Sequence, residues 1–371
     1  MAEFYTEGVS RNKRRSNREL RNGKDLALLI LDVLVVLLMI ILVITSLIAV
    51  ICQFVSPEKS GVLSVVSLAA PILYLLDLVV MFYWVVRLRW YHALTMAIVV
   101  IIGLFNLSKY YNLDIDRVYE TSYKERKYTK IMTYNVRDGR VNGLVEYIAS
   151  HNPDILCLQE INVKSDNWEL LQEKYKTTFD ENNISNNQIL TKYKMIRRGE
   201  IEGLALREGV WADLRIKDDT VRVLSLHLKS TSISPRDTEF LEKHKYILDS
   251  ERESKLRSII HRLVENNQKR AVQAEAVATF MKSSPYKIVV CGDFNDVPLS
   301  YTYRTIAKRL DDTFSKKASG FACTYNTLYK LLRIDNILVS SAIEVVTYDV
   351  DNEVELSDHY PVISRVIINN K

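Results

Sequence analysis

The chain has 371 residues, of which 48% are hydrophobic and 26% charged, with 11 Gly and 7 Pro. These proportions exclude a collagen-like, low-complexity or wholly disordered chain, and the length predicts two units or one large α/β domain. Lys and Arg number 50 against 45 Asp and Glu, a net charge of +5 that gives no general electrostatic case for nucleic acid. Four Cys without a CxxC pair exclude a disulfide-dense scaffold and a cysteine-based zinc module.

Three apolar segments near the N-terminus have the composition of membrane spans. Val33 to Phe54 carries no charge and is long enough to cross a hydrocarbon core about 30 Å thick. It is too long for the apolar region of a signal peptide, which has about 7–15 residues. Val62 to Val86 is the second candidate, with Asp77 inside it, and Tyr91 to Leu107 is a shorter third. We therefore expect three spans, which makes the lipid bilayer a partner of these helices.

Basic residues flank these segments unevenly and predict their orientation. A basic cluster from Arg11 to Lys24 precedes the first span, and Arg87 and Arg89 lie between the second and third. Because Lys and Arg are retained in the cytoplasm, three spans place everything after Ser108 outside, in the periplasm of a bacterial cell. We expect a multi-pass protein of the cell inner membrane. Two spans would reverse the compartment, and a nucleic-acid-binding arm is the alternative interpretation of the basic N-terminus.

Four regions follow along the chain. We expect a basic cytoplasmic N-terminus at 1–25, a transmembrane region of about three helices at 26–107, a polar linker at 108–127 and a soluble domain at 128–371. Strand-like runs recur in the soluble domain and begin at Lys130, Ile155, Gln188, Gly209, Val221, Lys287, Ile334 and Pro361. Helical patterns lie between some of them, after Leu144, from Trp168, and over a long charged stretch from about Thr238 to Lys282.

The spacing of these runs predicts the sheet architecture. Adjacent strands at 209–228 favour a hairpin, and strand–helix–strand stretches favour parallel crossovers, so the sheets should be mixed. About a dozen short strands exceed what one compact sheet usually holds. Two packed sheets with helices outside fit better.

Several apolar strands end in carboxylates, carboxamides or imidazoles. These residues are Asn135, Glu160, His227, Asp293, Asn295, Asp358 and His359. A single Asn after a strand is usually a turn former and a single Glu is usually solvated. Seven such positions favour a site instead, because burying acids at a rim costs several kcal/mol each unless a cation or partner compensates.

The donor types in this set predict a hard cation. Oxygen ligands dominate, and there is no HExxH or HxxxH pair, so Mg²⁺, or Mn²⁺ in its place, is expected and zinc is disfavoured. Mg²⁺ held by few protein ligands commonly completes its shell with phosphate oxygens, which indicates phosphoester chemistry. No GxxxxGK[ST] loop or GxGxxG occurs, which argues against P-loop hydrolysis and Rossmann redox chemistry.

An ordered set of motifs resembles the endonuclease/exonuclease/phosphatase superfamily, over about residues 128–371. The motifs are TYNVR (133–137), PDILCLQE (153–160), LSLHLKS (224–230), VVCGDFND (289–296), RIDNILVS (333–340) and LSDHYPV (356–362). The resemblance implies a four-layer α/β sandwich, two mixed β-sheets flanked by helices, preceded here by the α-helical transmembrane region. With the PLSYTY stretch (298–303), the whole arrangement is similar to membrane-anchored bacterial members of the superfamily.

The resemblance also implies roles for the residues that match. Glu160 would be the principal Mg²⁺ ligand, with Asn135 and Asp358 nearby. Asp293 would orient or deprotonate the attacking water, and Asn295 would hold the phosphate. His359, supported by Asp335, and His227 would donate to the phosphate oxygens and stabilise the charge of an in-line displacement.

The substrate is the least defined part of the prediction. We expect a Mg²⁺-dependent phosphoric ester hydrolase, a phosphodiesterase or phosphatase, that acts on a lipid headgroup or small phosphodiester ahead of nucleic acid. A nuclease is the first alternative, although the main basic cluster lies at the wrong end of the chain for one. A non-catalytic membrane interaction module is the second. The charged stretch from Thr231 to Gln268 is either a solvated helix or a substrate-selecting flap, and no protein partner is inferred.

Overall fold

The computed structural model describes residues 2–112, 127–177, 185–242, 250–321, 323–327 and 330–368. Side chains are described from Asp25 onward, except at 235 and 241–251. Most of the expected linker at 108–127 therefore lies outside the described residues. The chain divides into two compact units, Met1–Ile48 with Ile72–Leu104, and Ala49–Pro71 with Phe105–Lys371.

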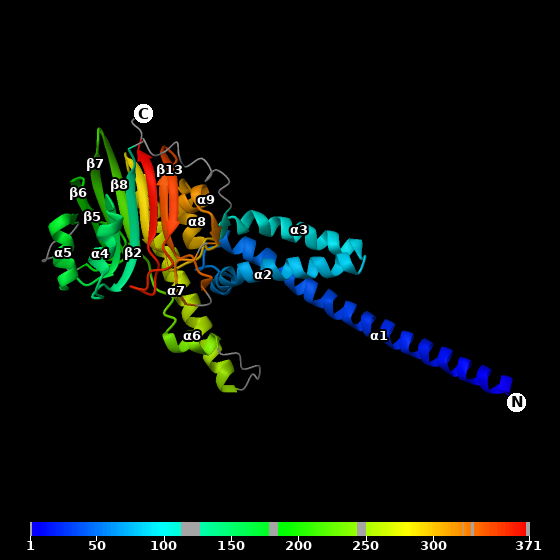
Figure 1. The fold of residues 1–371 in the computed structure, drawn as a ribbon. Coiled ribbons are helices and arrows are strands. Elements are labelled where there is room, and N and C mark those ends of the chain that lie inside the picture. The colour runs from blue at the N-terminus through cyan, green and yellow to red at the C-terminus, as the bar shows by residue number, and fades with distance from the viewer. Residues whose placement is uncertain are drawn as a thin grey trace. The chain divides into compact units, whose positions relative to one another are not determined.

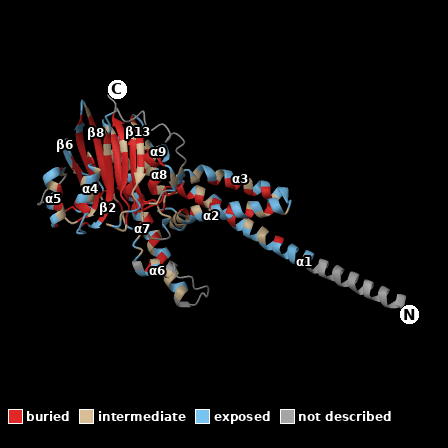
Figure 2. Ribbon diagram, in the orientation of Figure 1, coloured by how far each residue is buried: buried red, intermediate tan, exposed pale blue. Residues whose placement is uncertain are grey.

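The first unit is built from most of the helices α1 (Ala2–Ile51), α2 (Gly61–Val86) and α3 (Trp90–Leu107), whereas residues 49–71 and 105–107 belong to the second unit. Three segments in them are long and apolar enough to cross a membrane, Asp25–Phe54, Gly61–Val86 and Trp90–Leu107. Their leucines and isoleucines are largely exposed, as the pale blue faces in Figure 2 show. Two polar contacts join the helices: Arg87 forms a 2.7 Å ion pair with Asp32, and Ser46 donates a 2.6 Å hydrogen bond to Asp77.

The second unit holds two six-stranded sheets (Figure 1). The first sheet has the order β13-β14-β2-β3-β5-β4; its strands are β2 (Thr129–Asp138), β3 (Ile155–Ile161), β4 (Lys176–Thr177), β5 (Gln188–Thr191), β13 (Ile343–Val350) and β14 (Val362–Ile368). The second has the order β10-β12-β9-β8-β7-β6; its strands are β6 (Lys194–Glu200), β7 (Gly209–Ile216), β8 (Asp219–His227), β9 (Lys287–Asp293), β10 (Leu310–Asp312) and β12 (Asp335–Ser340). A short pair, β1 (Tyr111–Asn112) with β11 (Gly320–Phe321), lies apart from them.

Both sheets are mixed, as the sequence predicted. The strand pairs β2·β3 and β8·β9 are parallel, each joined through helices, and β7·β8 is the expected antiparallel hairpin. Parallel neighbours need a crossover, and the intervening helical patterns provide it.

Alternate strand residues face different layers, which places the core. Ile131, Cys157, Val223 and Cys291 lie in the cluster between the two sheets, where both thiols are buried and free. The helices α4 (Leu144–His151) and α5 (Asp166–Lys174) cover the outer face of the first sheet. The helices α7 (Ser250–Lys282) and α8 (Tyr301–Ala307) cover the outer face of the second. These layers form the predicted four-layer sandwich.

Two sequence assignments are corrected by the structure. The run QILTKYKMI from Gln188 is not one strand: β5 ends at Thr191 and β6 begins at Lys194, in the other sheet. The Thr191 hydroxyl accepts a hydrogen bond from the Tyr193 amide, which turns the chain there. The edge strand β13 was not anticipated. The charged stretch before β9 forms α6 (Pro235–Glu242) and α7, and the remaining short helices are η1 (Cys52–Phe54) and α9 (Thr313–Lys317).

Candidate active site

The carboxyl ends of four central strands bring polar side chains to one edge of the sandwich. In the first sheet, Asn135 of β2 pairs in register with Gln159 of β3, next to Glu160. In the second, Asp293 at the end of β9 lies opposite both His227 of β8 and Asp335 of β12. Residues far apart in the chain meet here because both parallel pairs end at the same edge.

Gly292 allows this register between β8 and β9. Its φ is +131°, a conformation that disfavours any side chain. A Cβ at this position would lie 2.0 Å from the carbonyl oxygen of Leu226. Glycine at the start of the GDFN motif is therefore required for close backbone contact directly before Asp293.

Asp293 is the centre of the hydrogen-bond network and is only 1% exposed. Its Oδ1 accepts from the backbone N–H of Asn295 at 2.8 Å, and its Oδ2 accepts from the side-chain amides of Asn295 at 3.0 Å and Asn135 at 3.2 Å. The Nε2 atoms of His227 and His359 lie 3.9 and 3.8 Å from the same Oδ2. These contacts fix the carboxylate in one orientation.

Glu160 reaches the same network from the first sheet. Its Oε1 accepts from Asn135 Nδ2 at 3.0 Å and lies 3.3 Å from His227 Nε2. Its side chain is 37% exposed, and its backbone has a φ of +58°, a conformation that non-glycine residues rarely adopt outside functional sites. Unlike Asp293, Glu160 therefore has a carboxylate that remains open to a ligand.

Asp358 lies beside the end of β2, and each of its two carboxylate oxygens has a neighbouring side chain. The Ser357 hydroxyl donates to the backbone carbonyl of Asn135 at 2.8 Å and contacts Asp358 Oδ1 at 3.3 Å. Arg137 Nη1 lies 3.4 Å from Asp358 Oδ2. Glu160 and Asp358 supply carboxylate oxygens at this end of the first sheet, which is the donor chemistry of a hard divalent cation, and these two residues fit such an ion. The Asn135 side-chain oxygen accepts from the Arg137 amide and its Nδ2 faces Glu160, so Asn135 would offer an oxygen ligand only if its amide turned over.

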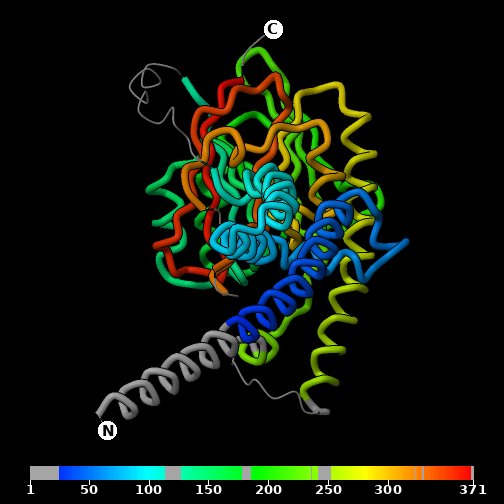
Figure 3. The backbone as a smooth tube through the Cα atoms, turned by 90° about the vertical axis from the view of Figure 1, so that its right-hand side faces the viewer, coloured from blue at the N-terminus to red at the C-terminus, as the bar shows by residue number. Residues whose placement is uncertain are grey.

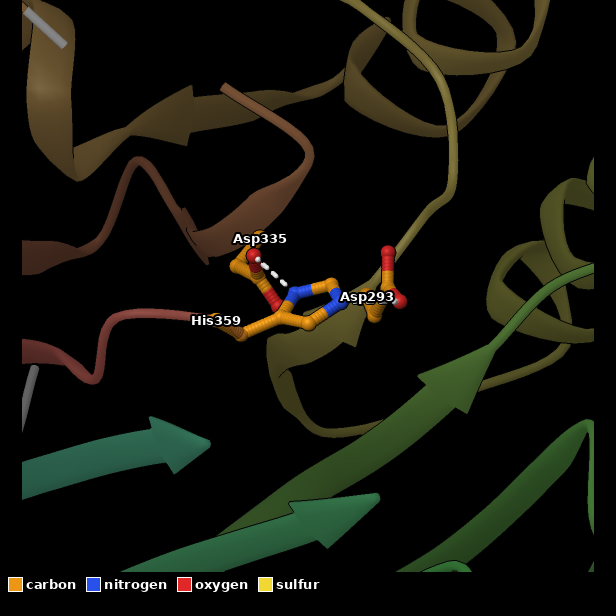
Figure 4. A group of neighbouring side chains, drawn as sticks. All are labelled: Asp293, Asp335 and His359. Carbon is orange, nitrogen blue, oxygen red and sulfur yellow. Dashed lines mark hydrogen bonds and ion pairs between the residues drawn. The ribbon is translucent and has the colours of Figure 1, made fainter. Parts of the chain in front are cut away.

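His359 and Asp335 form a buried pair (Figure 4). His359 Nδ1 lies 2.9 Å from Asp335 Oδ2, which leaves Nε2 directed toward Asp293. Burial alone would lower the pKa of His359, but the carboxylates of Asp335 and Asp293 outweigh it and raise this pKa to about 10. Burial also raises the pKa of Asp335, against the opposing effect of His359. The imidazole is therefore cationic at neutral pH.

Asp293, Asp335 and His359 offer ligand atoms within 4.8 Å of one another, a spacing that could hold a metal ion. The 2.9 Å contact between the imidazole and Asp335 is hydrogen-bond geometry, however, and a metal at His359 Nδ1 would have to break it. We therefore interpret the three residues as a hydrogen-bonded group, and the more open Glu160 as the better ligand.

Two residues beside the site, Tyr325 and Thr324, were not predicted from the sequence. The ring of Tyr325 lies 4.9 Å from that of His359, and the two residues form an isolated β-bridge. The Thr324 hydroxyl accepts from the backbone N–H of Asp335 at 3.0 Å. Both residues precede β12 outside any regular strand, so no periodic pattern marked them. Arg137 was visible in the TYNVR motif but received no role.

A buried polar bridge joins the two sheets beneath the site. Gln159 Nε2 donates to the Ser225 hydroxyl at 3.1 Å, and that hydroxyl donates to Asn187 Oδ1 at 2.6 Å. All three side chains are fully buried. Gln159 precedes Glu160 and Ser225 lies two residues before His227, so the bridge connects the strands that carry the two site residues.

The Endonuclease/Exonuclease/phosphatase family model matches residues 132–359, and the chain belongs to this family. A domain of unknown function (DUF8431) matches residues 32–110. Among curated proteins none matches the chain. Members of the family are metal-dependent phosphoester hydrolases, and this protein is accordingly an enzyme that hydrolyses phosphoric ester bonds.

Solved structures with a similar fold include an endonuclease/exonuclease/phosphatase family protein from Bacteroides thetaiotaomicron, 17% identical, covering 66% of this chain and 99% of that one, with a TM-score of 0.46. A mannosyl-6-phosphatase from Bacteroides thetaiotaomicron VPI-5482 is 17% identical and covers 64% of this chain and 99% of its own, with a TM-score of 0.45. D. rerio TDP2 in complex with a single-strand DNA product is 15% identical, with corresponding coverages of 65% and 100% and a TM-score of 0.47.

Proposed function

We propose that the protein is a membrane-anchored, Mg²⁺-dependent phosphodiesterase or phosphatase whose substrate is a lipid headgroup or another small phosphate ester. The observation that carries this proposal is a network that joins Glu160 and His359 to Asp293. The Asn135 amide donates to both Glu160 and Asp293, and the Nε2 atom of His359 lies 3.8 Å from Asp293 Oδ2. An open acid, a fixed acid and a cationic imidazole at one edge suit hydrolysis at phosphorus.

The roles of the protein side chains follow from their contacts. A divalent cation held by Glu160, with Asn135 and Asp358 as further oxygen donors, would neutralise charge on the phosphate. Asp293 orients the attacking water and takes its proton, because the amides of Asn295 and Asn135 fix its carboxylate. The water oxygen adds to phosphorus as the ester oxygen leaves from the opposite side.

The imidazoles stabilise the charge that develops during this step. His359 is kept cationic by Asp335 and donates through Nε2 to a phosphate oxygen, and His227 donates from the other side of Asp293. Asn295 donates from its side-chain amide to Asp293 and to the Leu228 carbonyl, and to hold the phosphate it would turn one of these N–H groups from its present acceptor to the substrate. These roles are proposals for each named residue.

Contacts within the second unit support a site close to the membrane surface. Cys52 Sγ lies 3.8 Å from the carbonyl oxygen of Leu299, and Arg304 lies 3.9 Å above the ring of Phe54. Cys52 and Phe54 end the first candidate span. Leu299 follows Asp293 by six residues, a separation of at most about 20 Å even for extended chain. This proximity favours a substrate at the bilayer surface over long nucleic acid.

The same contacts favour three spans. With three spans the segment at 52–60 and the hydrolase domain lie on one side of the membrane, as their packing requires, and Arg87 and Arg89 lie on the other side with the basic N-terminus. We therefore propose an inner-membrane, multi-pass protein with a periplasmic catalytic domain. Protease added to spheroplasts should cleave after residue 108 and spare sites before residue 25. Protection of the C-terminal part in sealed cells would contradict this topology, and a reporter fused after Asn112 gives an independent measurement.

The enzymatic proposal is tested by a hydrolysis screen of the purified full chain in detergent. The substrates are bis(p-nitrophenyl) phosphate, p-nitrophenyl phosphate, duplex DNA and phospholipid vesicles, each with Mg²⁺, with Mn²⁺ and with EDTA. We expect metal-dependent turnover of a small ester or lipid, absent in Asp293→Asn. Preference for DNA would instead assign a nuclease, and no turnover on any substrate would favour a non-catalytic module.

A further inference from the structure

One buried guanidinium lies behind the site without belonging to it. Arg270, in the middle of α7, is fully buried. Its Nη1 donates to the backbone carbonyl of Lys229 at 2.7 Å, its Nε lies 3.4 Å from Asp296 Oδ2, and its Nη2 donates to the side-chain oxygen of Asn267. The side chain of Arg270 thus contacts three different segments of the chain.

Two of these segments carry proposed site residues. Lys229 lies two residues after His227, and Asp296 directly follows Asn295. At the site itself the segments are already joined, because Asn295 Nδ2 donates to the Leu228 carbonyl at 3.1 Å and the Leu228 amide donates to the Asp293 carbonyl at 3.0 Å. Arg270 forms a second connection between them from behind.

The third contact leads to the segment where the second candidate span begins. Asn267 Nδ2 donates to the Ser64 hydroxyl at 2.6 Å. Figure 3 shows this blue part of the chain beside the yellow-green α7. Arg270, through Asn267, therefore connects the loops of the site to the start of α2.

The chemistry of the contacts explains why an arginine is used. A buried charge is costly unless it is paired and hydrogen-bonded. The planar guanidinium donates in fixed directions to three acceptors at once, whereas an ammonium is a compact point charge on a flexible stem. Lysine at this position keeps the charge but loses that fixed geometry.

We propose that Arg270 is a positioning residue for the hydrolysis: it fixes the segments 228–230 and 294–297 relative to each other, and hence His227 and Asn295, and it ties both to the start of α2. The inference rests on the proposed function of those two residues. It predicts that Arg270 acts on kcat through Asn295 without touching the substrate.

Arg222, which lies in β8 of the second sheet, offers a matched control for Arg270. It is also buried, and it forms a bidentate pair with Asp213 at 2.7 and 2.9 Å. It lies five residues before His227, toward the other end of β8. Arg222→Lys therefore damages a buried arginine pair of similar kind without disturbing the loops of the site.

The experiment compares Arg270→Lys, Arg222→Lys and the unmodified full chain in detergent, with bis(p-nitrophenyl) phosphate and Mg²⁺ at a temperature well below each Tm. We expect both variants to lose thermal stability. Arg270→Lys should lower kcat about tenfold or more with little change in KM, and Arg222→Lys should keep kcat within about twofold. Equal kcat losses in the two variants, or an unchanged kcat in Arg270→Lys, would overturn the proposal.

A milder variant keeps the test decisive if Arg270→Lys does not fold. Asn267→Ala leaves the contacts of Arg270 with Lys229 and Asp296 in place and removes the connection to Ser64. Because Asn267→Ala also removes one of the three acceptors of Arg270, we expect a kcat below that of the unmodified chain with little change in KM, and a kcat equal to that of the unmodified chain would overturn the proposal. Absence of turnover in the unmodified chain would instead defeat the proposed function, so the two failures are distinguishable.

Discussion

Where β8 and β9 begin, acids are matched with cationic side chains. Asp219 forms an ion pair with Lys287, and Asp213 is held bidentately by Arg222. Where the same strands end, the nitrogen atoms of His227 and His359 lie 3.9 and 3.8 Å from the Asp293 carboxylate, and no Lys or Arg among the described residues forms an ion pair with it. At the start of these strands, each of these two acids therefore has a cationic partner within the protein and needs no bound ion.

The second arrangement gathers acids with fewer fixed cations. Glu160 and Asp293 share one neighbouring imidazole, that of His227, and Glu160 keeps 37% of its side chain exposed. Such a cluster gains from a bound cation and an anionic substrate, which the paired end does not need. Acids that lack fixed cationic partners thus distinguish the site from the opposite end of the sheet, where acids are paired. Mutations at the two ends should therefore have different effects.

Asp293→Asn should have the largest effect. The amide nearly preserves the shape but cannot take a proton from water, so we expect kcat to fall by about 10²–10⁴ with the fold intact. Steady-state hydrolysis of bis(p-nitrophenyl) phosphate measures this, and circular dichroism checks the fold. A folded variant with near-full turnover would remove Asp293 from the reaction.

Glu160→Gln should come next and should act through the metal. Losing the open carboxylate should raise the Mg²⁺ concentration for half-maximal rate and lower the maximal rate on the order of 10²-fold. Mg²⁺ titrations after EDTA treatment measure both quantities. Glu169→Gln, an exposed acid in α5, is the control and should match the unmodified chain. If both variants titrate alike, Glu160 is not a metal ligand.

Asp335→Asn should reduce kcat by a smaller factor, about 10- to 100-fold, because His359 keeps its position but loses the charge that holds it cationic. The raised pKa of His359 means that the protonation of His359 contributes fully to stability below pH 6.5 and that this contribution is lost as pH rises through about 10.

The pH–rate profile of the variant should therefore lose its alkaline side at a lower pH than the unmodified chain. Urea unfolding at pH 6 and pH 10 should show a smaller difference in the variant than in the unmodified chain. Superimposable profiles would show that Asp335 does not control the proton on His359.

Asp219→Asn, at the paired end, should have the smallest effect. Its hydrogen bond with Lys287 lowers the pKa of Asp219, so the pair stabilises the fold above the ordinary carboxyl pKa and this contribution is lost as pH falls through the lowered value. We expect a loss of at most about 1 kcal/mol in the free energy of unfolding and no change in kcat. A large kcat loss here would remove the functional distinction between the two ends.

Much of the site could be predicted because its residues directly follow apolar runs with a clear strand pattern. Apolar runs with period two mark β2, β3, β8 and β9, and the polar residue after each run marks an end. Since crossover connections make two of these pairs parallel, their ends had to meet. The local patterns place Glu160 and Asp293 each at a strand end, but their meeting also depends on how the two sheets pack, because the two residues lie in different sheets.

The features that the sequence did not predict depend on contacts between distant segments of the chain. Arg270 looks like one more charged residue in a long helix, and its burial arises only when α7 packs on the second sheet. Tyr325 lies in a loop whose path is set by the bridge to His359. The split after Thr191 was missed because both halves of that run are compatible with strand and only the assembly assigns them to different sheets.

That split has a consequence for folding. β5 ends in one sheet and β6 begins in the other after only Lys192 and Tyr193, so neither sheet can dissociate far without pulling on its partner. The buried backbone amides of both sheets should then exchange with deuterium through one shared opening event rather than two successive ones. We therefore expect the sandwich to unfold as one cooperative unit, without a stable half-folded form in which the two halves of the site are apart.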